Sequence, residues 1–177
     1  MKRAIAFVAF LFCTLAALAQ APAPMKPGPE QKNLDYFNGN WTLEGDLKPG
    51  PGMPGGKMTE TEQNKWMDGG FFLVSHVDFK GGGMGNGTGI SVMGYDPRIK
   101  MYTYDEYNSM GEAEHATGTF DGTTWTWSSD EEMGGQKMKG RFTVKELTPT
   151  SYTFKFEIAP AGDFMTVMEG TATKSKS

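Results

Sequence analysis

The residue best placed to do chemistry is His76, one of only two histidines in the chain. In an extended segment residues two apart share a face, so His76 would lie beside Asp78. A neighbouring carboxylate can orient an imidazole for acid–base catalysis or for a polar contact with a ligand. The opposite face of this segment, which carries Leu73 and Val77, is the more apolar one. The alternative is therefore a solvent-exposed histidine.

A second group lies in residues 100–108, where Tyr102, Tyr104 and Glu106 fall on one face of an alternating segment. Phenols and carboxylates of this kind orient ligands in otherwise apolar cavities. The other face also carries a phenol and a carboxylate, so either face could line a cavity. The alternative is that the tyrosines form cross-strand pairs and the carboxylates face water. Asp105 and Glu106 point to opposite faces, which argues against a glycosidase pair.

Trp125 and Trp127 share a face and would either pack in a core or stack on a flat ligand. Phe72 falls on the same face of its segment as His76. The candidate ligand-binding residues are therefore His76, Phe72, Tyr102, Tyr104, Glu106, Trp125 and Trp127. We predict no catalytic set, no metal site and no cofactor.

Short alternating segments separated by turn signals must position these residues. About ten strands are predicted, after one short helix at 30–37. The short hairpin-like links favour an all-β, single antiparallel up-and-down barrel, with a two-sheet Greek-key sandwich as the alternative. Two glycine-rich loops lie at 48–56 and 80–87, and their glycine stretches 50–56 and 81–87 are predicted to rim one or both barrel mouths and to gate entry. The predicted strands cover 41–47, 57–67, 71–79, 89–95, 100–108, 114–120, 123–129, 137–147, 151–158 and 164–174.

The N-terminus has the pattern of a cleaved signal peptide over residues 1–19, with two basic residues, an apolar run and an Ala-Leu-Ala exit. A proline-rich leader at 20–29 would follow, then one domain at 30–174 without cysteine. Loss of Lys2 and Arg3 would lower the net charge from −4 to −6. This acid excess argues against nucleic acid as a partner. We expect an exported protein, periplasmic or extracellular, without a membrane span.

Several motifs occur together in the order and spacing of a bacterial family known only as domain of unknown function 1579. They are Leu34-Asp35-x-Phe37-x-Gly39-x-Trp41, Trp66-x-Asp68-Gly69-x-Phe71-x-Leu73, Gly94-Tyr95-Asp96-Pro97, Asn108-Ser109-Met110-Gly111, Gly118-Thr119-Phe120-Asp121-Gly122 and Met168-Glu169-Gly170. The chain resembles this family over residues 30–174. The resemblance implies a lipocalin-like (calycin) barrel, distantly similar to fatty-acid-binding proteins and to the haem-binding nitrobindins, and it implies no known activity.

Haem binding does not carry over from the nitrobindins. Gly39-x-Trp41 matches the start of their glycine–tryptophan motif, but Leu43 replaces the next glycine, and no histidine follows His115 to hold haem near the C-terminus.

We therefore expect a monomer or homodimer that binds a small apolar or amphipathic molecule in the barrel lumen, and no enzyme. Two alternatives remain open. One is a filled barrel serving as an envelope interaction or structural module. The other is an enzyme using acid–base chemistry through His76 with Asp78 or Glu106.

Overall fold

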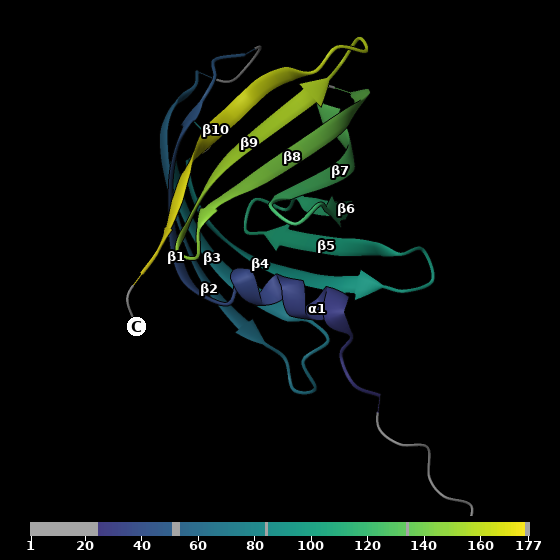
Figure 1. The fold of residues 1–177 in the computed structure, drawn as a ribbon. Coiled ribbons are helices and arrows are strands. Elements are labelled where there is room, and N and C mark those ends of the chain that lie inside the picture. Colours follow the sequence, from purple (N-terminus) through teal and green to yellow (C-terminus); the bar gives the residue numbers. More distant parts are fainter. Residues whose placement is uncertain (1–24, 51–53, 84, 134, 176–177) are drawn as a thin grey trace, which may run out of the picture.

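Ten antiparallel strands form a closed barrel in the computed structural model (Figure 1). The structure describes residues 25–50, 54–83, 85–133 and 135–175. The predicted signal peptide and the first part of the predicted leader lie outside these residues. The elements are α1 (Pro29–Asn33), η1 (Leu34–Tyr36), β1 (Gly39–Leu47), β2 (Gly56–Trp66), β3 (Leu73–Gly81), β4 (Gly85–Asp96), β5 (Met101–Asn108), β6 (Ala113–Phe120), β7 (Thr124–Met133), β8 (Gln136–Thr148), β9 (Ser151–Ala159) and β10 (Met165–Lys174).

Each strand pairs with its neighbours in the sequence, and β1 pairs with β10 to close the barrel. The predicted up-and-down barrel is therefore confirmed, and the sandwich alternative is wrong. Two segments differ from prediction. Strand β7 extends to Met133, past its predicted end at residue 129. The glycine-rich stretch 80–87 is mostly strand, because Gly81 pairs with Gly85 across a very short turn. Gly82 and Gly83 have φ of 66° and 74°, a left-handed conformation that glycine adopts without strain.

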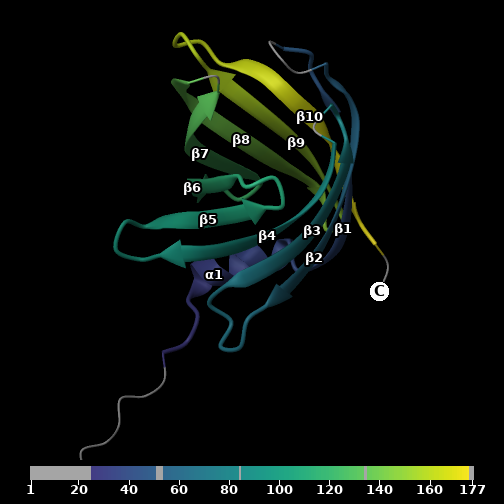
Figure 2. The ribbon, with the colours of Figure 1, turned by 180° about the vertical axis from the view of Figure 1, so that it is seen from behind.

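The short helical segment α1 and η1 lies across one end of the barrel (Figures 1 and 2). Side chains of two strands hold it there. The indole Nε1 of Trp41 donates to the carbonyl oxygen of Phe37 at 2.8 Å, and the amide Nδ2 of Asn33 donates to the hydroxyl of Tyr102 at 2.9 Å. This end is called the helix end below.

The opposite end, called the loop end, carries the connections β1–β2 and β3–β4, because consecutive antiparallel strands alternate in direction. The two predicted glycine loops therefore lie at the same end. They also approach each other, since a Cβ added at Gly83 would lie 2.7 Å from the side chain of Pro54.

Strand alternation divides the side chains into an inward and an outward set. Along β1, Trp41, Leu43 and Leu47 are buried, while Asn40 and Glu44 are exposed. The pairing register carries this phase around the barrel, because directly opposite residues face the same side of a sheet. It assigns every described strand residue to the lumen or to the outer surface.

Candidate functional site

Five of the seven predicted ligand-binding residues face the lumen. Tyr102, Trp125 and Trp127 are buried there, while Tyr104 and Glu106 are partly exposed. Ligand contact by these residues remains a prediction. The register also shows that the face of 100–108 with Tyr102 points inward, because Tyr102 lies directly opposite Tyr95 and Gly118, which are in the inward phase.

The other two candidates are not in the lumen. His76 is exposed on the outer face of β3, because its neighbours Ser75 and Val77 occupy the inward phase. Phe72 precedes β3 and is 44% exposed. Their placement as lumen contacts is therefore wrong. A shared acid–base site of His76 with Glu106 is also contradicted, since the two side chains lie on opposite faces of the barrel wall.

The helix end of the lumen is filled by aromatic rings, which we call the aromatic floor: Phe37, Trp41, Tyr102, Trp125 and Tyr152. The rings of Tyr102 and Trp125 meet edge to face with centroids 4.8 Å apart, and those of Phe37 and Trp125 lie 5.2 Å apart. Offset and edge-to-face contacts of this kind add to the stability that ring burial provides. All five residues are at most 5% exposed, so no ligand reaches deeper than this layer.

Above the floor, the lumen is lined by carboxylates, which we call the acidic belt: Glu60 and Glu62 of β2, Glu106 of β5 and Glu114 of β6. Glu62 pairs with Trp41 and with Val77, and Glu106 pairs with Glu114, which places all of them in the inward phase. All four are partly exposed. The floor and the belt together make the lumen apolar at one end and acidic further along.

Three of these four glutamates were not selected from the sequence. A signal for two of them was present, because Glu60 and Glu62 alternate in phase with Met58 and Trp66. Apolar residues at both ends of an alternating segment indicate which face is buried. Glu114 carried no such signal in its own segment, and only its pairing with Glu106 shows its orientation.

The environment of the belt favours protonated carboxyls. Burial raises the pKa of Glu60 well above its usual range, and the charges of Glu62 and Glu106 raise it further. Burial also raises the pKa of Glu62, against the lowering effect of its hydrogen bonds. The charge of Glu106 raises the pKa of both Glu60 and Glu62, although β3 and β4 lie between β5 and β2 in the sheet. Charges on these strands therefore interact across the lumen.

The pKa values of Glu114 and Glu106, the belt residues of β6 and β5, are raised as well. Burial raises the pKa of Glu114 to about 7, helped by repulsion from Glu131, Glu106 and Glu112, while His115 on the outer face lowers it. Burial likewise raises the pKa of Glu106, which accepts a short hydrogen bond from the hydroxyl of Tyr104. Desolvated carboxylates close together cost free energy when all are ionised.

A row of smaller polar side chains joins the belt to the floor. Asn64 pairs with Ser75, Ser75 with Ser91, and Ser91 with Glu106, all facing inward. The amide Nδ2 of Asn64 donates to the carbonyl of Phe37 at 3.0 Å and to a carboxylate oxygen of Glu62 at 2.9 Å. Its Oδ1 atom and the Oγ atom of Ser75 have no hydrogen-bond partner in the part of the chain that the structure describes, although both residues are only 1% exposed.

Such orphaned polar atoms are uncommon, because burying one without a partner costs about 1 to 3 kcal/mol. The structure thus has one buried acceptor, Oδ1 of Asn64, and one buried hydroxyl, that of Ser75, that a bound molecule or ordered water would satisfy.

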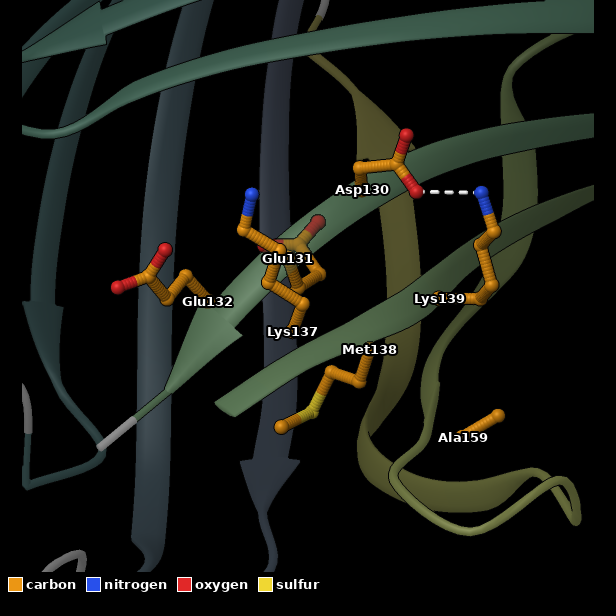
Figure 3. Close-up of a pocket in the computed structure, with 7 residues that line it drawn as sticks. All are labelled: Asp130, Glu131, Glu132, Lys137, Met138, Lys139 and Ala159. Atoms are coloured by element: carbon orange, nitrogen blue, oxygen red, sulfur yellow. Dashed lines mark hydrogen bonds and ion pairs between the residues drawn. The ribbon is translucent and has the colours of Figure 1, made fainter. Parts of the chain in front are cut away.

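Figure 3 shows a different depression, of about 540 Å³, at the loop end of β7 and β8. Its lining is strongly charged, and Asp130 and Lys139 form an ion pair within it. Glu131 and Met138 also line it, and they pair with each other in the inward phase. Five of the seven residues that line this depression are charged, whereas small-molecule sites are typically lined mostly by apolar side chains.

Among the described residues, no group of three or more histidine, cysteine or acidic side chains is arranged to hold a metal ion. No helix in the described ranges is long and apolar enough to cross a membrane.

Comparison with known proteins addresses the fold and the family. No curated protein matches the chain. Among solved structures, the crystal structure of Rv2717c from M. tuberculosis has a TM-score of 0.60 and 11% sequence identity, and the match covers 84% of this chain and 99% of that one. At this identity the likeness concerns the fold alone. The model of a family of proteins of unknown function, DUF1579, matches residues 26–174. Because the match covers almost the whole described barrel, the chain belongs to the DUF1579 family.

Proposed function

We propose that this protein is an exported binding protein that holds a small apolar or amphipathic molecule in the lumen of its barrel. The observation that carries the proposal is the accessibility of inward-facing side chains above the aromatic floor. Tyr104, Glu106 and Glu114 face inward and yet retain contact with solvent. A completely filled barrel would leave these side chains as buried as Trp125.

The composition of this region supports small-molecule binding. Ligand sites combine aromatic or apolar surface with a few converging polar groups. Here Trp127 and Tyr104 lie with ring centroids 5.8 Å apart, and the hydroxyl of Tyr104 donates to Glu106. An amphipathic molecule would place its apolar part on the rings and its polar part near the belt.

The test uses a neutral apolar fluorescent probe, N-phenyl-1-naphthylamine, and two tryptophan substitutions on adjacent residues. Ser91→Trp adds a large side chain inside the lumen, while Val92→Trp adds it to the outer face. We expect probe emission to rise with wild-type protein and with Val92→Trp, and to fall at least fivefold with Ser91→Trp. Circular dichroism confirms that both variants fold.

Equal emission from wild type and Ser91→Trp would place the probe outside the lumen and refute the proposal. Absence of any emission gain, together with no co-purifying small molecule in native mass spectrometry, would favour the alternative of a filled structural module.

Export is a separate part of the proposal and has its own test. Cleavage after Ala19 predicts a secreted or periplasmic product that begins at Gln20. Intact-mass measurement of the protein from a fractionated bacterial culture distinguishes this product from an uncleaved one.

A further inference from the structure

The acidic belt has no cationic counterpart within the described part of the chain. Ion pairs there lie on the outer surface, as in Lys57 with Asp46 and Lys48 with Glu169. Lys174 binds at the helix end instead, where its Nζ donates to the carbonyl oxygen of Tyr36 at 3.0 Å and lies 5.0 Å from the centroid of the Trp41 ring. When the carboxyls of the belt are ionised, no lysine or arginine side chain among the described residues is placed to balance their charge.

The lumen also holds two buried oxygen atoms that have no hydrogen-bond partner among the described residues. The orphaned Oδ1 of Asn64 can only accept, and both amide hydrogens of the same residue are directed to Phe37 and Glu62. Ionised carboxylates likewise accept only. The unpartnered hydroxyl of Ser75, the residue paired with Asn64, can accept a hydrogen bond as well as donate one. These two buried atoms are observed independently of the charges, and they point to the same missing partner.

We propose that the lumen binds a small organic cation with an apolar body, such as an aryl-alkyl amine. This inference rests on the proposed function and names the chemical class of its ligand. An ammonium group carries three donors and a positive charge, which matches a site rich in acceptors and negative charge.

The aromatic residues bordering the belt suit the rest of such a ligand. Trp127 stacks on Trp125 at 6.1 Å between centroids with an interplanar angle of 7°, and it also contacts Tyr104, which bonds to Glu106. An aryl group against these rings would place an attached ammonium near Glu106. Cations are further attracted to the face of an indole or phenol ring.

The experiment compares three molecules of nearly equal shape: 2-phenylethylamine, 2-phenylethanol and phenylacetate, which are cationic, neutral and anionic at pH 8. Dissociation constants are measured by isothermal titration calorimetry at low salt. We expect the amine to bind at least tenfold more tightly than the alcohol and phenylacetate to show no binding. Affinity for the amine is expected to fall at least tenfold from pH 8 to pH 5, as the belt becomes protonated.

Three variants connect the preference to the lumen. Glu106→Gln and Ser75→Ala should each weaken amine binding at least fivefold, whereas alcohol binding should change less than twofold. Glu44→Gln makes the same charge change as Glu106→Gln on the exposed face of β1 and should leave both affinities unchanged.

The outcomes separate this inference from the proposed function. If the alcohol binds as tightly as the amine, or if Glu44→Gln weakens the amine as much as Glu106→Gln, the cation preference is refuted while lumen binding stands. If the naphthylamine probe enters the lumen but none of the three molecules binds, the cation proposal also fails. If the probe fails as well, both proposals fall.

Discussion

Glu114 provides a direct test of the argument that the lumen destabilises its own ionised carboxylates. Its pKa is raised from 4.5 to about 7, first by burial and then by the charges of Glu131, Glu106 and Glu112. A carboxyl with a raised folded-state pKa favours folding in its protonated form. This favourable state is complete below the unfolded-state pKa and is lost as the pH rises through the folded-state pKa. The free energy of unfolding should therefore fall between about pH 4.5 and pH 7.

The size of the effect follows from the shift. One pKa unit corresponds to about 1.4 kcal/mol, so the full shift amounts to about 3 kcal/mol. Glu114 retains some solvent contact, which reduces the expected effect to about 2 kcal/mol. The substitution Glu114→Gln keeps the side-chain volume and removes the ionisation. We expect the variant to match wild type within about 0.5 kcal/mol at pH 5 and to exceed it by about 2 kcal/mol at pH 8.

The assay is urea unfolding followed by tryptophan fluorescence, at pH 5, 6, 7 and 8 and constant ionic strength. Trp125 and Trp127 are buried in the folded state, so their emission reports on the barrel itself. Glu44→Gln on the outer face serves as the control and should show the same difference from wild type at every pH. A Glu114→Gln curve parallel to wild type across the whole range would refute the reasoning, as would a wild-type stability that rises with pH.

Three other substitutions test the packing, the attachment of the helix and the orphaned acceptor. Gly170→Ala should lower the free energy of unfolding, measured in urea, by about 3 kcal/mol, because its Cβ would lie 2.2 Å from the backbone oxygen of Glu44. In the control Gly50→Ala the added Cβ would meet none of the described residues within 4 Å, so this change should be neutral. Tyr102→Phe removes the hydroxyl that accepts from Asn33 and should cost about 1 kcal/mol in thermal unfolding, with amide exchange faster in α1. Ser75→Ala removes an unpartnered hydroxyl, so calorimetry should find the ligand-free variant as stable as wild type or more stable by up to about 1 kcal/mol. A free energy of unfolding lower than wild type by more than about 1 kcal/mol would show that the hydroxyl of Ser75 has a partner after all.

The number and order of strands could be predicted from the sequence because alternation and turn residues are local properties. All ten strands lie within a few residues of their predicted bounds, and η1 ends one residue before the predicted helix does. The two largest differences are the end of β7, at Met133 where 129 was predicted, and the start of β4, at Gly85 although alternation is visible only from residue 89. Glycine has no side chain that could contribute to an alternating pattern. The strand conformation of the glycine-rich start of β4 therefore follows from pairing with β3, which the local sequence does not indicate.

The site was less predictable because it depends on contacts between distant segments. The apolar phase of Leu73 and Val77 argued correctly for an exposed His76, yet the residue was still selected for its chemistry. Glu60 and Glu62 belong to the lumen because Leu43 and Trp41 are their register partners on β1. The raised pKa of Glu60 also depends on Glu106, three strands away in the sheet. No periodicity within one segment contains that information.

The pairing of β1 with β10 has a consequence for the order of folding events. Nine of the ten strand pairs form between sequence neighbours and close short loops, which occurs quickly and at little entropic cost. The last pair joins Trp41 to Lys174 and must close nearly the whole domain. Until residues 165–174 arrive, β1 and β9 present unpaired edges that favour association with other chains. The final strand therefore acts as the element that converts an aggregation-prone curved sheet into a protein without edges.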